Sequence, residues 1–207
     1  MIQMLEFRRR HGARRLASCI YCKLLYRALQ QIYRFDPWHA SAPFACREYK
    51  VRAVDLASST HSRVVLDIGC GLGDIIGRVR AEKRWGVDKS TAAIAAARRL
   101  FGGRVCFAIG SLFAPDEIAN VVPDRPIDLV IITNWAHGVE LEQLIVIIRS
   151  IQQKLSVRML LIDTVRPGIL EGCFAHSIDD LARLGEVKSS VDCGDGTRDL
   201  HLIALTP

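Results

Sequence analysis

The sequence contains no long apolar run. None of its segments approaches the ~18 consecutive apolar residues that a membrane-spanning helix requires, although hydrophobic residues make up 50% of the 207-residue chain. The absence of such a run argues against a membrane span. The hydrophobic content is nevertheless sufficient for one domain whose core is buried on two faces, with room for a terminal extension.

The cysteines lack the pattern of a disulfide framework or of a zinc site. All seven are scattered along the chain and their number is odd. We therefore expect free buried thiols in a reducing compartment, and a cytoplasmic protein. Cys19-x-x-Cys22 has no second pair at zinc-ribbon spacing, so we predict no metal site.

Acidic residues are nearly absent from residues 1–34. This segment contains eight basic residues against Glu6 alone, a net charge of +7, so the rest of the chain is near −1. Such asymmetry argues against a nucleic-acid-binding enzyme and for a separate role of the N-terminus. Residues 1–33 contain no proline and are predicted to be helical. Their apolar stripe is expected to consist of Leu16, Ile20, Leu24, Leu25 and Leu29.

Several roles for this basic helix stay open. It could pack on the parent domain with its arginines solvated, cover a cofactor cleft, or contact a second subunit in a homodimer. It could also lie on an anionic membrane surface, which would place the protein at the inner face of a membrane. We treat residues 1–61 as a basic helical extension followed by an aromatic lid, and residues 62–207 as the main domain.

The chain is organised around residues 63–78, RVVLDIGCGLGDIIGR. A short apolar run typical of a strand buried on both faces ends at Asp67, and a glycine-rich turn follows. Apolar residues then resume at helical spacing, which predicts a helix. In a dinucleotide-binding G-x-G-x-x-G pattern the third glycine would fall at Asp74. A carboxylate there is a poor neighbour for a pyrophosphate, which argues against a dehydrogenase.

The spacing of this turn resembles the first motif of class I S-adenosylmethionine-dependent methyltransferases. In that family the turn lies along the methionine and ribose part of the cofactor. The resemblance therefore implies that S-adenosyl-L-methionine is the cofactor. It also implies cofactor contacts from Asp67, Gly69, Cys70, Gly71 and Gly73.

The next predicted strand also ends in an acidic residue. Asp88 lies ~20 residues beyond the first glycine, where a Rossmann-type site places the carboxylate that accepts both ribose hydroxyl protons. We add Lys89, its neighbour, to the cofactor site. The family often has an acid after the third strand, near the adenine. This chain has Ser111 and Leu112 there instead, so the adenine contact would fall to them.

The remaining pattern predicts an α/β fold with a doubly wound, mostly parallel, seven-stranded sheet. Its strands are expected at residues 64–66, 84–88, 105–109, 127–133, 159–162, 187–191 and 200–205. Helices are expected at residues 48–58, 91–100, 115–120, 140–155 and 178–184. The final two strands flank Gly194-Asp195-Gly196, which suits a C-terminal antiparallel hairpin.

Two segments are expected to face the acceptor. Residues Arg34–Lys50, with two prolines, form a loop before the main domain and supply the candidate substrate residues Trp38, His39 and Tyr49. The fourth strand runs into Asn134, Trp135 and His137. Asn134 is assigned to the cofactor and Trp135 to the substrate. His137 has the ionisation range of a general base, with His39 second; each could equally be a packing residue.

The sequence lacks several motifs that are typical of particular acceptor classes. The chain has no Asn/Asp-Pro-Pro-aromatic run after the fourth strand, no Pro-Cys pair of cytosine-C5 enzymes, and no Asp-Asn pair beside Asp163. We therefore expect no nucleic-acid partner. The expected function is O- or N-methylation of a small molecule, a sugar or a lipid-linked acceptor. The alternative is a cofactor-binding but non-catalytic partner or regulatory subunit.

Overall fold

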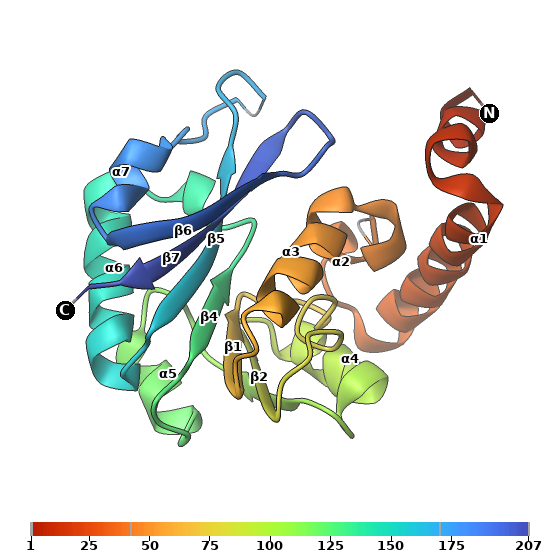
Figure 1. The fold of residues 1–207 in the computed structure, drawn as a ribbon. Coiled ribbons are helices and arrows are strands. Elements are labelled where there is room, and N and C mark those ends of the chain that lie inside the picture. The colour runs from red at the N-terminus through yellow and green to blue at the C-terminus, as the bar shows by residue number, and fades with distance from the viewer. Residues whose placement is uncertain (1, 42, 170, 207) are drawn as a thin grey trace.

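The computed structural model describes residues 2–41, 43–169 and 171–206, and side chains at residue 9 and from residue 11 onward. One seven-stranded sheet, in the order β3-β2-β1-β4-β5-β7-β6, lies between two layers of helices (Figure 1). The strands are β1 (Val64–Ile68), β2 (Lys83–Asp88), β3 (Cys106–Ile109), β4 (Leu129–Ile132), β5 (Met159–Val165), β6 (Gly185–Asp192) and β7 (Arg198–Leu205). The α-helices are α1 (Ile2–Tyr33), α2 (Pro37–Ser41), α3 (Glu48–Ser59), α4 (Thr91–Phe101), α5 (Pro115–Val121), α6 (Leu141–Leu155) and α7 (Ile178–Ala182).

The sheet is buried on both faces because its central strands are apolar at successive positions. Leu66 and Val130 belong to the core beneath α5, α6 and α7, whereas Val65 and Ile131 belong to the core beneath α3 and α4. Five strands are parallel, and β7 pairs antiparallel with both β5 and β6. The predicted doubly wound sheet with its terminal hairpin is confirmed.

Side-chain caps mark the start of α4 and of α6. The Ser90 hydroxyl accepts a hydrogen bond from the Ala93 N–H at 3.1 Å and begins α4, as predicted. Likewise, the Glu140 carboxylate accepts from the N–H groups of Glu142 and Gln143 at the start of α6. Such caps satisfy N–H groups that have no partner inside the helix.

The segment after the glycine turn differs from prediction. Residues 71–78 form consecutive turns and not the expected α-helix. The N–H groups of Gly77 and Val79 do donate to carbonyls four residues earlier, but the bonding is not continuous. Three glycines with positive φ, at 69, 71 and 73, fold the chain too tightly for a regular helix to begin.

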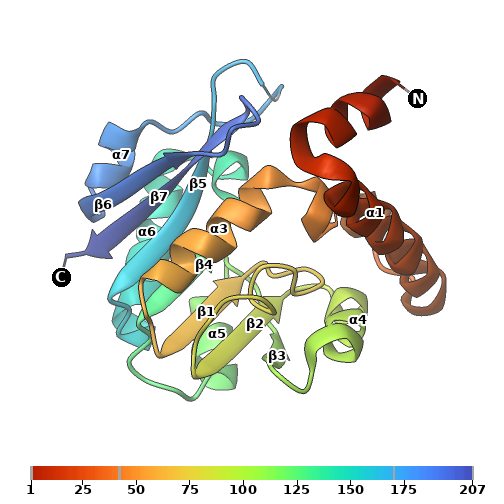
Figure 2. The ribbon, with the colours of Figure 1, turned by 45° about the vertical axis from the view of Figure 1, so that its right-hand side comes forward.

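Helix α1 packs on the domain with only part of the predicted stripe. Tyr26 and Leu29 are buried against Ala93 and Ala96 of α4, and α1 lies on the side of the molecule that carries α4, away from β6 and β7 (Figure 2). Ile20 and Leu24 of the predicted stripe are exposed. The sequence did not indicate that Cys19 and Tyr26 join Leu29 on the packing face. Met1 lies outside the described residues.

None of the helices in the described ranges combines the length and the apolar character that a bilayer crossing requires.

The lid segment, residues Arg34–Lys50, is more ordered than the predicted loop. It contains α2, the 3-10 helix η1 (Phe44–Cys46) and the start of α3. Phe35 and Ala40 are buried with Tyr26 of α1, so the lid is anchored to the N-terminal helix. Within residues 1–61, α3 contributes Ala53 and Ala57 to the main core. The division at residues 61 and 62 stays a prediction.

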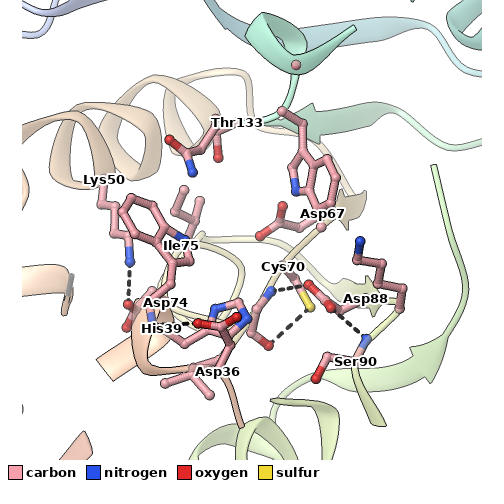
Figure 3. Close-up of a pocket in the computed structure, with 18 of the residues that line it drawn as sticks. Asp36, His39, Lys50, Asp67, Cys70, Asp74, Ile75, Asp88, Ser90 and Thr133 are labelled. Carbon is pink, nitrogen blue, oxygen red and sulfur yellow. Dashed lines mark hydrogen bonds and ion pairs between the residues drawn. The ribbon is translucent and has the colours of Figure 1, made fainter. Parts of the chain in front are cut away.

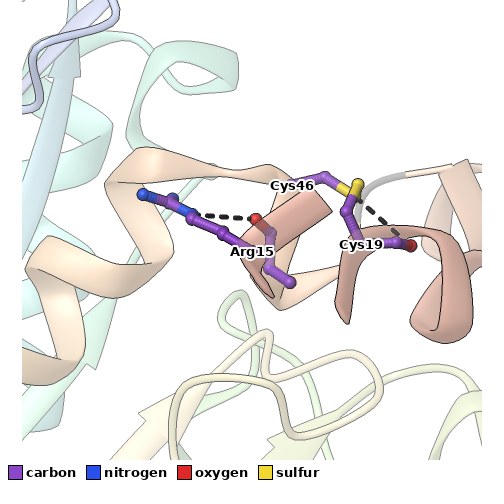
Figure 4. The surroundings of a disulfide bond; sticks show 4 residues. Arg15, Cys19 and Cys46 are labelled. Atoms are coloured by element: carbon purple, nitrogen blue, oxygen red, sulfur yellow. Dashed lines mark hydrogen bonds between the residues drawn. A yellow bond between two sulfur atoms is a disulfide. The ribbon is translucent and has the colours of Figure 1, made fainter. Parts of the chain in front are cut away.

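A disulfide corrects the expectation of free thiols for two of the seven cysteines, and the other five are free. Cys19 of α1 is bonded to Cys46 of η1, with their Cα atoms 5.2 Å apart (Figure 4). Beside it, the Arg15 guanidinium donates to the Ala45 carbonyl at 3.1 Å and pairs with Glu48 at 2.7 Å. No pattern in the sequence indicates this pairing, because the packing of η1 on α1 is what brings the two residues together.

Replacing Cys19 by serine is expected to lower the free energy of unfolding by about 3–4 kcal/mol, because the bond closes a loop with a sequence separation of 27. Chemical denaturation of the variant and of the oxidised wild type measures the difference. Cys22→Ser, which alters a free thiol on the same helix, is the control. Equal stability of Cys19→Ser and the wild type would contradict a stabilising disulfide.

Candidate active site

The glycine turn lies at the carboxyl end of β1, where the strand order reverses between β2 and β4. The N–H groups of Gly69 and Cys70 donate to the Val87 carbonyl at 2.7 and 3.1 Å, and the Gly71 N–H donates to Asp88 at 2.9 Å. These bonds fold the turn over the end of β2. In open α/β sheets such a switch point is where ligands bind.

A cavity of about 550 Å³ opens at this point, within the usual size range of small-molecule sites. It is bounded by the glycine turn, the ends of β2 and β4, and the lid segment (Figure 3). Its described lining is Asp36, Trp38, His39, Tyr49, Lys50, Asp67, Gly69, Cys70, Gly71, Leu72, Asp74, Ile75, Asp88, Lys89, Ser90, Thr133, Asn134, Trp135, His137 and Gly138.

Most predicted site residues line this cavity, and three do not. Gly73, Ser111 and Leu112 are absent from the described lining. A Cβ at Gly73 would lie 2.8 Å from the Phe107 ring, so this glycine serves the packing of the turn. Leu112 is buried in the core. The Ser111 hydroxyl accepts a hydrogen bond from the Phe113 N–H at 3.3 Å. This bond belongs to the local turn at residues 111–113.

Glycine at 69 and 71 keeps the floor of the cavity open. Both have positive φ, +78° and +54°, a conformation that a side chain disfavours. A Cβ at Gly69 would lie 1.9 Å from the Trp135 indole nitrogen, and one at Gly71 would lie 2.9 Å from the His39 ring. Because these two glycines carry no side chain, the lid and the loop after β4 can both approach the backbone of the turn closely.

Asp88 is fixed by the backbone around it. Its two carboxylate oxygens accept from the N–H groups of Gly71 and Ser90, each at 2.9 Å. A carboxylate has about four lone-pair sites, so two acceptor directions remain for a ligand. Neighbouring Asp67 is fully buried, and burial together with the charge of Asp88 raises its pKa to about 7.

Asp74 is the main site residue whose role sequence reasoning missed. Its carboxylate accepts from the Tyr26 hydroxyl of α1 and pairs with Lys50 of α3 at 2.7 Å and with Arg78 at 3.4 Å. Burial beside this carboxylate raises the pKa of Tyr26 far above its usual value, so Tyr26 stays a donor. Helix α1 thereby reaches the cofactor side of the cavity.

The charges in the cavity are mostly negative. Four aspartates, at 36, 67, 74 and 88, face two lysines, at 50 and 89. Among the described residues, no group of three or more His, Cys, Asp or Glu side chains is arranged to hold a metal ion. This balance favours a ligand that carries a cationic group over one that carries a pyrophosphate.

Asn134 is held in a left-handed conformation at the end of β4, with φ of 64°. Its N–H donates to Asp163 at 2.7 Å, and its side-chain oxygen accepts from Arg198 at 3.0 Å. Arg198 also pairs with Asp163 at 2.7 Å and lies 4.3 Å from the centre of the Tyr49 ring. The sequence did not indicate that residues of β5 and β7 form hydrogen bonds with this loop.

Two histidines line the cavity from opposite sides, His39 from the lid and His137 from the loop after β4. Burial lowers the pKa of both imidazoles, so both are neutral at pH 7. The Nδ1 atom of His137 is buried without a hydrogen-bond partner in the described structure. His137 therefore has an unused nitrogen, whereas His39 lies over the turn at Gly71.

No protein-family model and no curated protein matches the chain. Solved structures are similar to it at low identity. The N-methyltransferase NodS from Bradyrhizobium japonicum WM9, in complex with S-adenosyl-L-homocysteine, is 18% identical, with a TM-score of 0.67 over 88% of this chain and 98% of that one. Magnesium protoporphyrin IX methyltransferase from Synechocystis PCC 6803 is 13% identical, with a TM-score of 0.60 over 77% and 84% of the respective chains. TnmH is 19% identical, with a TM-score of 0.55 over 94% and 70%.

At such identities the likeness concerns the fold alone. It covers most of each compared chain. The chain therefore has the fold of class I S-adenosylmethionine-dependent methyltransferases.

Proposed function

We propose that the chain is an S-adenosylmethionine-dependent methyltransferase that methylates oxygen or nitrogen of a small molecule, a sugar or a lipid-linked acceptor. The observation that carries the proposal is the cavity in which the glycine cradle and Asp88 meet at the sheet's switch point. The structures of similar fold support it, since NodS was crystallised with S-adenosyl-L-homocysteine and bears the name of an N-methyltransferase.

The residues of the cavity fit this cofactor. A Cβ at Gly69 or Gly71 would fill the cradle, and the open acceptor directions of Asp88 suit a pair of ribose hydroxyls. The excess of aspartates over lysines in the lining suits the cationic part of the ligand. When bound, S-adenosylmethionine supplies an electrophilic methyl group on a sulfonium. The residues of the chain would hold an acceptor in line with that methyl group and accept the proton that the acceptor loses.

The acceptor side is aromatic and enclosed by the lid. Trp38 and Tyr49 line the cavity from the lid segment, and Trp135 lines it from the loop after β4. The Lys89 ammonium lies 5.4 Å from the centre of the Trp135 ring, which holds that indole near the cofactor side. A site of this size with aromatic walls favours a small acceptor over a nucleic-acid strand.

We expect His137→Ala to lower kcat by roughly 10²–10⁴-fold, the usual contribution of a general base. A base must be neutral, and burial lowers the pKa of His137. Wild-type activity should therefore be steady at neutral pH and fall as pH drops through that lowered pKa, and the variant should lose this acidic limb. The pH–rate profile measures it. His61→Asn, at an exposed histidine, is the control.

His39→Ala, measured in the same way, separates the two histidines. If the pH–rate profile of His137→Ala were unchanged and His39→Ala lost the acidic limb, the general base would be His39 of the lid.

Transfer of a labelled methyl group from S-adenosylmethionine to a cell extract tests the proposed activity directly. Labelled product that disappears in the Asp88→Ala variant supports a methyltransferase. Cofactor binding with no transfer to any fraction would favour the non-catalytic regulatory subunit.

A further inference from the structure

The outward face of α1 is apolar in its second half, beyond the kink at Gly12. Ile20, Tyr21, Leu24 and Ile32 are 40%, 66%, 62% and 70% exposed. They recur every three or four positions with the exposed Ala17 and Ala28, which places all six on one side of the helix. We call these six residues the α1 outer face. It lies opposite Cys19, Tyr26 and Leu29, which pack on the domain.

Basic side chains flank the α1 outer face. Arg14, Lys23 and Arg27 are exposed, and within the described residues none of them forms an ion pair with a carboxylate. The sequence contains no acidic residue from Phe7 to Phe35. The only described ion pair from this helix to the domain is made by Arg15, on the packed side. The surface is therefore both apolar and cationic.

We infer that the α1 outer face binds an anionic lipid bilayer. An apolar stripe with a basic border suits the bilayer interface, where the apolar side chains enter the acyl boundary and the cations stay among the headgroups. From Ala17 to Ile32 the stripe extends for about 22 Å along the helix axis.

Charge argues against a second copy of the chain as the occupant. In a two-fold symmetric dimer the same patch meets itself, so Arg14, Lys23 and Arg27 of each subunit would face like charges. The segment offers no carboxylate to compensate for them. An anionic bilayer supplies the opposite charge over the whole length of the stripe.

Vesicle co-sedimentation of the full chain tests this inference. We expect binding to vesicles of phosphatidylcholine mixed with phosphatidylglycerol, much weaker binding to phosphatidylcholine alone, and loss of binding at high salt. Arg14→Gln/Lys23→Gln/Arg27→Gln should weaken binding to the anionic vesicles by about a hundredfold. Leu24→Ser/Ile32→Ser should weaken it by at least about tenfold.

Matched variants control for charge and apolarity elsewhere. Arg80→Gln/Arg99→Gln/Arg104→Gln removes the same charge from exposed positions of the main domain. Val121→Ser/Val146→Ser removes exposed apolar side chains from α5 and α6. Neither should change vesicle binding. Binding of S-adenosylmethionine by each variant shows that the fold is intact and reports separately on the proposed function.

Three outcomes would overturn the inference. One is the absence of binding to anionic vesicles. Another is an equal loss of vesicle binding in the α1 variants and in their control variants. The third is a dimer, seen by light scattering, that Leu24→Ser/Ile32→Ser converts to a monomer with no vesicle binding in either form. That result would assign the α1 outer face to a subunit interface.

Discussion

Replacing Asp88 by alanine is expected to weaken S-adenosylmethionine binding by roughly a hundredfold or more. The variant loses two charge-assisted hydrogen bonds to the ribose, each worth about 1.5–3 kcal/mol. It also loses the acceptors that hold the N–H groups of Gly71 and Ser90, so the cradle itself should loosen. Isothermal titration calorimetry measures the change in Kd.

A second variant separates contact with the cofactor from support of the turn. Asp88→Asn keeps the shape and one acceptor oxygen, so it should lose less affinity than Asp88→Ala. Asp55→Ala removes an exposed carboxylate from α3 and should leave the Kd unchanged. Unaltered affinity in Asp88→Ala would show that the cofactor does not lie at the end of β2.

Gly69→Ala should reduce cofactor affinity by at least about tenfold and lower stability by roughly 1–2 kcal/mol, because φ is positive at this position. The added methyl carbon would lie 1.9 Å from the Trp135 indole nitrogen, so Trp135 must move. The cavity then loses its shape on the cofactor side and on the acceptor side together. Calorimetry and chemical denaturation measure the two effects.

Gly103→Ala is the matched control, because a Cβ at that glycine meets nothing within 4 Å. It should leave cofactor affinity unchanged. If Gly69→Ala bound S-adenosylmethionine as tightly as Gly103→Ala, the cofactor would not depend on close approach to the turn.

The cofactor side of the site could be predicted because it is local in sequence. Asp67, Gly69, Gly71 and Asp88 belong to two consecutive strands and the turn between them, so their spacing alone brings them to one edge of the sheet. The strands could be predicted for a similar reason. Apolar runs such as that of β4 leave few alternatives when both faces are buried.

Residues joined by long-range packing could not be predicted. Asp74 pairs with Lys50 and Tyr26, 24 and 48 positions away, and Asn134 depends on Arg198, 64 positions away. The Cys19–Cys46 bond and the packing face of α1 likewise depend on how η1 and α4 dock. No periodicity within one segment carries that information. The acceptor side of the cavity is assembled from such contacts, so spacing along the chain does not predict it.

The central claim is that the cradle between Asp67 and Asp88 holds S-adenosylmethionine. A calorimetric titration of the chain with S-adenosylmethionine, followed by the same titration with NAD, tests it most directly. We predict saturable one-to-one binding of S-adenosylmethionine and no binding of NAD, because position 74 lacks the third glycine of a dinucleotide-binding turn. Binding of NAD without binding of S-adenosylmethionine would contradict it.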